Sequence, residues 1–142
     1  MSAPTIDLAD RQEIAELLVR YATGIDRRDW ALFATCFTDD CVADYGDIGV
    51  WKSSGEITTW MDEMHAGCGH TLHRITNETV WQDGEDVRAR SYVEAIVLGP
   101  DNANGVRAAG FYEDVVVKGD NGWQISRRQF TPVLMQLVEA LS

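Results

Sequence analysis

Long hydrophobic runs are missing from this sequence. No apolar stretch approaches the roughly twenty residues that a membrane-spanning helix needs. Residues Met1 to Pro4 also lack the charged and apolar regions of a secretory signal. We therefore expect a soluble, cytoplasmic protein that is not inserted in a membrane.

Basic residues are scarce. The chain carries 12 Lys and Arg against 23 Asp and Glu, which gives a formal charge of −11. That charge repels phosphate backbones and anionic lipid surfaces. We therefore expect neither nucleic-acid binding nor binding to a membrane surface.

Cysteine and histidine are also few. The three cysteines show no C-x-x-C spacing, which argues against a disulfide framework and against a thiolate zinc site. We expect them to be small packing residues in a reducing compartment. No acidic residue stands at recognisable metal-ligand spacing from His65, His70 or His73, so no metal site is predicted.

Amphipathic segments are what the chain does have. Its 142 residues are 45% hydrophobic and fit one domain spanning 1–142. Apolar residues recur at helical spacing between Leu8 and Thr23, with Asp7 or Asp10 available as the N-cap and Gly24 as a stop. This pattern predicts an amphipathic first helix.

Two further helices are expected before residue 70. Asp29 can cap a short one that continues through Phe37. Ser53 and Glu56 form a capping-box pattern that opens the next helix, whose apolar face carries Ile57, Trp60, Met61 and Met64. That face is either plain core or the lid of a pocket, because Met side chains adapt to ligands.

Strand-like segments follow, separated by turns that contain glycine. A short hairpin at the sheet edge is predicted over 41–51, and long strands over 71–81, 87–98, 106–118 and 123–133. Helices at the start and antiparallel strands at the end predict an α+β fold. In this fold a strongly curved, mostly antiparallel sheet wraps three N-terminal helices and leaves a cone-shaped space.

The first long strand begins beside two of the three histidines. Alternation from residue 71 places His73 and Asn77 on one face, with Ile75, Thr79 and Trp81. A lone histidine in a half-buried strand is more often structural than catalytic. Asn77 fits a structural hydrogen bond or a contact with substrate. A charged partner for His73 would favour a catalytic role.

Several short motifs occur together along the chain. They are Tyr21-Ala-Thr-Gly-Ile-Asp26, Asp29-Trp30, His73-x-x-x-Asn77, Gly110-x-Tyr112-x-Asp114 and Gly122-Trp123-Gln124-Ile125. With the order of helices and strands, they resemble the nuclear transport factor 2-like superfamily, and within it the SnoaL-like branch. That branch is similar to scytalone dehydratase, bile-acid 7α-dehydratase and hexachlorocyclohexane dehydrochlorinase. The resemblance implies a cone-shaped α+β barrel and a lyase that uses neither a metal nor an organic cofactor.

The resemblance also assigns roles to individual residues. The family's catalytic aspartate falls on Asp26, and its catalytic histidine falls on His73. The dehydratases carry a tyrosine five residues before that aspartate, matched by Tyr21, and a pocket tyrosine matched by Tyr45. The dehydrochlorinase has a lysine at the first of these places, so Tyr21 favours the dehydratases. A basic residue that some members carry near the end of the last strand has no match, because Val133 occupies its place.

The chemistry of these side chains fits such an activity without the family. Removing a proton next to a carbonyl needs a base that is neutral near physiological pH, and imidazole is the natural choice, so His73 is the expected base. A carboxylate on the other ring nitrogen orients the imidazole and raises its basicity, which is the expected role of Asp26. A phenol, Tyr21 or Tyr45, can donate to a developing enolate or a departing hydroxide.

Three functions are compatible with this set of residues. The leading one is a cofactor-independent lyase, most simply a dehydratase. Its substrate would be a hydrophobic ring-bearing molecule in a pocket that contains Tyr21, Tyr45, Trp60, Met61, Met64 and His73, with Asn77 as a further candidate contact. An isomerase or cyclase with the same base comes second, since proton removal is the shared first step. A non-catalytic ligand-binding or assembly domain comes third, although the presence of both Asp26 and His73 argues against it.

Apolar residues on the outer sheet face predict a homo-oligomer. They are Tyr92, Ile96, Leu98, Phe111, Val115 and Val117. The resemblance implies a trimer rather than a dimer, because the lyases that the chain resembles are trimers. The apolar tail over 134–141 would cover part of a neighbouring copy or the mouth of the cone. Arg127 and Arg128 are expected to pair with carboxylates on exposed faces. Tyr112 and Asp114 are expected to serve the fold or an interface.

Overall fold

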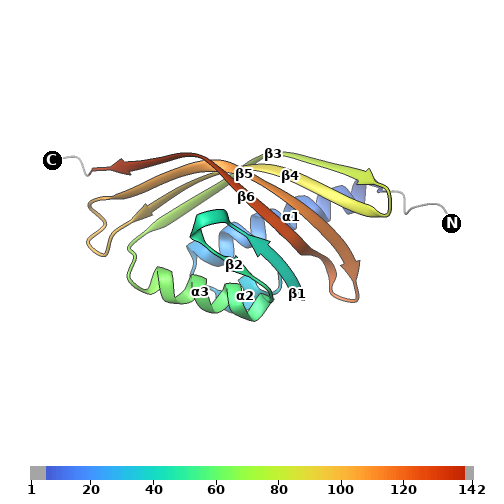
Figure 1. The fold of residues 1–142 in the computed structure, drawn as a ribbon, viewed down its shortest axis with the longest axis horizontal. Helices are drawn as coiled ribbons and strands as arrows, with labels where there is room; N and C mark the ends of the chain where they lie inside the picture. The colour runs from blue at the N-terminus through green and yellow to red at the C-terminus, as the bar shows by residue number, and fades with distance from the viewer. Residues whose placement is uncertain (1–5, 140–142) are drawn as a thin grey trace.

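Three helices pack against one face of a single curved sheet in the computed structural model, which describes residues 6–139 (Figure 1). The helices are α1 (Leu8–Asp26), α2 (Trp30–Ala34) and α3 (Ser54–Ala66), and a 3-10 turn, η1, spans Gly46–Ile48. The strands are β1 (Phe37–Asp44), β2 (Val50–Trp51), β3 (Thr71–Asp83), β4 (Asp86–Leu98), β5 (Gly105–Gly119) and β6 (Gly122–Val138). Met1 to Pro4, on which the export prediction rests, lie outside the described part. Leu141, at the end of the predicted apolar tail, also lies outside it.

The sheet confirms the predicted α+β fold. Its strand order is β2-β1-β6-β5-β4-β3, and every pair is antiparallel except β1 with β6. The sheet curves over the helices without closing, so β2 and β3 are its edges and the cone is open on one side. None of the helices described over residues 6–139 is long and apolar enough to cross a membrane.

Helix α1 lies along the inner face of the sheet. Asp7 is its N-cap and forms a reciprocal capping box with Asp10, which decides between the two predicted caps. The predicted stop at Gly24 is wrong, because the helix continues to Asp26. Gly24 instead lets α2 approach closely, since a Cβ at this position would lie 3.0 Å from the backbone of Phe33. The two extra residues place Asp26 at the end of α1.

The second helix is shorter than predicted. It ends at Ala34, and Phe37 opens β1 instead of closing the helix. The backbone N–H of Ile125 donates to the Cys36 carbonyl at 2.8 Å, which holds β1 parallel to β6. The predicted edge hairpin is therefore only partly right, because β1 lies inside the sheet and the two-residue β2 forms the edge.

A bulge interrupts the predicted alternation of β3. Thr76 pairs with Tyr92 and Thr79 pairs with Arg90, so β3 carries one extra residue between these pairs. Asn77 adopts a φ of 56° there, a left-handed conformation that Asn tolerates. The prediction that Asn77 shares the face of His73 is therefore wrong, since its side chain is exposed. Beyond the bulge the faces exchange, and Val80 is buried while Trp81 is exposed.

Candidate active site

Asp26 and His73 meet where the end of α1 passes the start of β3. One carboxylate oxygen of Asp26 accepts a hydrogen bond from Nδ1 of His73 at 2.7 Å, and the other accepts from the His73 backbone N–H at 2.8 Å. The His73 side chain is 9% exposed and that of Asp26 is 20% exposed. Within residues 6–139 the Nε2 atom of His73 has no hydrogen-bond partner. Because Nδ1 carries the proton shared with Asp26, Nε2 is free to accept another.

A second layer of polar groups fixes the carboxylate. Thr71 donates its hydroxyl to Asp26 at 2.9 Å, and Arg28 donates to the Thr71 hydroxyl at 2.8 Å and to the Gly69 carbonyl at 2.6 Å. Burial would raise the pKa of Asp26, but the hydrogen bonds from the His73 ring, the His73 backbone and Thr71 outweigh burial and lower the pKa. Asp26 is therefore a carboxylate at neutral pH.

His73 borders a partly open, mostly apolar cavity of about 270 Å³ between the sheet and α3. Of the site residues predicted from the sequence, Tyr21, Tyr45, Trp60, Met61, Met64 and His73 line it. Asn77 and Asp26 do not, since Asn77 lies on the bulge and Asp26 stands behind the His73 ring. The remaining lining residues are Ile48, His65, Val93, Ala95, Val97, Val106, Ala108, Tyr112, Phe130 and Met135.

Three phenols form a hydrogen-bonded cluster in the cavity wall. The hydroxyl of Tyr21 lies 2.7 Å from that of Tyr45 and 3.1 Å from that of Tyr112. Burial raises the pKa of both Tyr21 and Tyr112, so these phenols keep their protons. Three hydroxyls supply three protons and the two bonds use two of them, which leaves one O–H to donate to a ligand oxygen.

Sequence reasoning missed Tyr112 as a cavity residue, although it stands in a quoted motif. The alternation of side chains along the strand could have revealed it, since Gly110, Tyr112 and Asp114 share one face of β5 and all three are buried. That face turns toward the helices and the cavity. Tyr112 and Asp114 were predicted to serve either the fold or an interface, and the interface alternative is therefore wrong.

Arg128 lies directly behind the phenols. It donates two hydrogen bonds to Asp114, at 2.8 and 2.9 Å, and both side chains are 0% exposed. Its guanidinium carbon is 3.7 Å from the ring centre of Tyr112 and 4.4 Å from that of Tyr21. Burial would lower the pKa of Arg128, but Asp114 more than offsets burial and raises it. The prediction that Arg128 lies on an exposed face is wrong.

A bulge in β6 explains that error. Val115 pairs with Arg127 and Val116 pairs with Ile125, so Ser126 is an extra residue in β6. The insertion turns Arg128 inward and leaves Arg127 exposed. Val133, which the sequence comparison placed at the family's basic position, is 72% exposed on the opposite face. The basic residue nearest the cavity is therefore Arg128.

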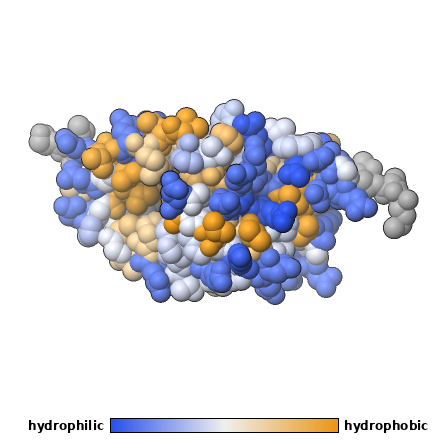
Figure 2. Space-filling view, viewed as in Figure 1, coloured by the Kyte–Doolittle hydropathy of each residue, from blue (hydrophilic) through white to orange (hydrophobic). Residues whose placement is uncertain are grey.

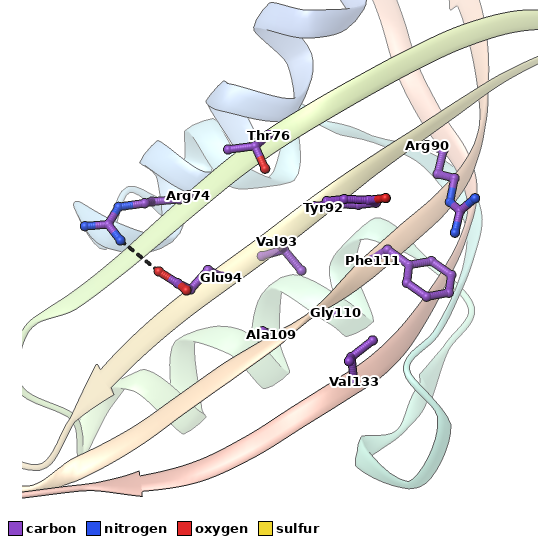
Figure 3. Close-up of a pocket in the computed structure, with 10 residues that line it drawn as sticks. All are labelled: Arg74, Thr76, Arg90, Tyr92, Val93, Glu94, Ala109, Gly110, Phe111 and Val133. Atoms are coloured by element: carbon purple, nitrogen blue, oxygen red, sulfur yellow. Dashed lines mark hydrogen bonds and ion pairs between the residues drawn. The ribbon is translucent and has the colours of Figure 1, made fainter.

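A second hollow lies on the outer face of the sheet, away from the helices (Figure 3). It measures about 540 Å³ and is lined by Arg74, Thr76, Arg90, Tyr92, Val93, Glu94, Ala109, Gly110, Phe111 and Val133. Its charged groups are paired or stacked, with Arg74 bound to Glu94 at 2.8 Å and Arg90 over the Phe111 ring. It contains no base held by a carboxylate, so the cavity beside His73 is the candidate active site. Within residues 6–139, no group of three or more His, Cys, Asp or Glu is arranged to hold a metal ion.

Comparison with known proteins agrees with the fold. The SnoaL-like domain family matches residues 7–129. This chain belongs to the SnoaL-like family. A candidate scytalone dehydratase from Novosphingobium aromaticivorans superposes with a TM-score of 0.84 at 20% identity, covering 95% of this chain and 91% of the other. Hexachlorocyclohexane dehydrochlorinase type 2 gives 0.82 at 20% identity, covering 94% and 92%.

A third solved structure of this SnoaL-like fold carries a different functional name. It is a candidate aromatic ring hydroxylase from Novosphingobium aromaticivorans, with a TM-score of 0.81 and 26% identity over 96% of this chain and 97% of the other. The three neighbours share one architecture under different names. The likeness therefore establishes the fold, and the reaction must be argued from the side chains.

Proposed function

We propose that this protein is a cofactor-independent lyase, most simply a dehydratase, acting on a hydrophobic ring-bearing molecule. The observation that carries the proposal is the 2.7 Å bond between Asp26 and Nδ1 of His73, beside a cavity lined almost entirely by apolar side chains. A structural histidine has no need of a buried carboxylate on one nitrogen and an unpartnered second nitrogen facing a cavity. This arrangement suits a general base.

The proposed reaction begins with proton transfer from a substrate carbon to Nε2 of His73. The electrons of the broken C–H bond form a carbon–carbon double bond, and the C–O bond to a hydroxyl on the neighbouring carbon breaks. The departing hydroxide leaves as water after taking back a proton from protonated His73, directly or through the phenols, which restores the neutral imidazole. Asp26 stabilises the imidazolium formed in the first step, since its carboxylate lies on the opposite ring nitrogen.

The phenol cluster provides the hydrogen-bond donor that the proposed reaction needs. One O–H among Tyr21, Tyr45 and Tyr112 is left to donate to an oxygen that gains charge, either an enolate or the leaving hydroxide. Arg128 stacks on two of these rings and sets a positive charge behind them. It does not line the cavity, so it acts through the phenols and does not touch the substrate.

Isomerase or cyclase chemistry is the second candidate, because it begins with the same proton transfer. Incubation with steroid, phenolic and polyketide-like compounds, followed by mass spectrometry, separates the two. Loss of water that requires His73 supports the dehydratase. A rearranged product of unchanged mass supports the isomerase. Tight binding in thermal-shift assays, with no conversion of any bound compound, would contradict both and favour a binding domain.

A further inference from the structure

His65 is a second histidine of the cavity wall, on α3. Its side chain is 3% exposed, and its Nδ1 lies 2.7 Å from the Met61 carbonyl oxygen. A carbonyl only accepts, so Nδ1 carries the proton and Nε2 carries a lone pair. Nε2 is buried and has no hydrogen-bond partner within residues 6–139.

An unpartnered buried acceptor is costly and calls for an explanation. Buried polar groups in native proteins nearly always have a hydrogen-bond partner. Protonation does not remove the problem, because burial lowers the pKa of His65 and the positive charge of Arg28 lowers it further, and together they outweigh the hydrogen bond to Met61. Since Nδ1 is tied to the helix backbone, Nε2 is the polar atom left on a ring that borders the cavity. It is buried in the ligand-free structure, so a ligand reaches it only when the side chains around it shift.

We propose that Nε2 of His65 accepts a hydrogen bond from the ligand, so that the cavity selects ring compounds bearing a hydroxyl or ring N–H on the side facing α3. The cavity then recognises two features of its ligand. The phenol cluster donates to an oxygen, and His65 accepts from a donor. This inference rests on the proposed function only in taking the cavity as the ligand site, and His65 takes no part in proton removal.

Indole and benzofuran give a matched pair of probes, because they have nearly the same shape and only indole carries an N–H donor. Titration calorimetry on the full chain should show indole binding about five- to tenfold more tightly, the usual net effect of one hydrogen bond. In His65→Phe, which keeps an aromatic ring but has no acceptor, the preference should disappear. His65→Gln, which restores an acceptor, should recover part of it.

A control makes the result specific. His70→Phe, at an exposed position outside the cavity, should keep the full preference. A preference kept in His65→Phe would overturn the proposal, as would equal binding of the two probes by the unmodified protein.

Nitrogen NMR of the ligand-free protein gives a readout that needs no ligand. The His65 ring should show a protonated Nδ1 and an unprotonated Nε2, and indole should shift the Nε2 resonance. A protonated Nε2 in the free protein would overturn the proposal. None of these measurements depends on turnover. The proposed lyase activity can therefore be disproved while the proposed hydrogen bond at His65 is supported, and the reverse also holds.

Discussion

Asp26 holds His73 at two points, since one carboxylate oxygen accepts from the backbone N–H at 2.8 Å and the other from ring Nδ1 at 2.7 Å. The same carboxylate therefore fixes both the start of β3 and the orientation of the imidazole. A rotated ring would lose the second bond while keeping the first. This double attachment holds Nε2 toward the cavity before any ligand arrives.

We expect His73→Ala to lower the rate of the chemical step by about two to four orders of magnitude, because it removes the proposed base. Asp26→Asn should cost less, since it weakens only the orientation and charge support of the imidazole. Rates measured with a converted substrate check both. Unchanged activity in His73→Ala would move the base to another residue, Tyr21 or Tyr45 first.

The lowered pKa of Asp26 also predicts a change in acid stability. The folded-state pKa lies below the ordinary value of 3.8, so the unfolded chain binds the proton more tightly. The contribution to stability is complete above about pH 4 to 5 and is lost as the pH falls through the lowered folded-state pKa. Asp26→Asn should therefore be less stable than the unmodified protein at pH 7, with the gap narrowing toward pH 3. Urea denaturation at several pH values measures this, and a constant gap would contradict it.

Local features of the fold were predictable from the sequence, and long-range ones were not. Capping residues and hydrophobic periodicity act within one or two turns, so the three helices and the long strands were found. The bulges at Asn77 and Ser126 each insert one residue against a partner strand, which one strand's own pattern cannot show. They reversed the faces of Trp81 and Arg128. Asp26 and His73 were paired through the family resemblance, because their separation of 47 residues leaves no local signal.

The Arg128–Asp114 pair predicts a large effect on stability. Both side chains are fully buried, so removing one leaves the other charge without a partner. Arg128→Met should lower the free energy of unfolding by about 3 to 5 kcal/mol, and adding Asp114→Leu should recover much of that loss. Chemical denaturation of the two single variants and the double variant measures the coupling. Additive losses would mean that the two charges do not depend on each other.

His65 predicts a second pH effect, near neutrality. Burial lowers its folded-state pKa below the ordinary value of 6.5, so the unfolded chain binds more protons in this range. Stability should therefore fall as the pH drops from about 6.5 through the lowered folded-state pKa. His65→Phe should lose this part of the slope, whereas His70→Phe should keep it. Thermal unfolding between pH 5 and 7.5 compares them, and identical slopes in the two variants would count against the prediction.

The outer sheet face predicts self-association. Tyr92 is 48% exposed and Val133 is 72% exposed, and both line the outer hollow with Phe111 (Figure 3). Further apolar side chains gather over the C-terminal end of β6, toward the left of Figure 2. Among them Leu134 belongs to the outer face, because its partner Ala109 lines the outer hollow, whereas Met135 lines the active-site cavity. A monomer seldom exposes so continuous an apolar surface, so we expect a second copy of the chain to cover it.

Light scattering at micromolar concentration should therefore give a multiple of 15.8 kDa, with a trimer favoured over a dimer. Val133→Asp places a charge in the wall of the outer hollow, where burial against another copy would leave the carboxylate unpaired. This variant should shift the protein toward the monomer by at least tenfold in dissociation constant, the equivalent of about 1.4 kcal/mol. Asp120→Lys, on the exposed turn between β5 and β6, is the control for a change of charge alone and should leave the mass unchanged. A monomer mass for the unmodified protein would show that this apolar face stays open to solvent. Because the active-site cavity opens on the opposite side of the sheet, the Asp26–His73 pair should be equally well formed in either state.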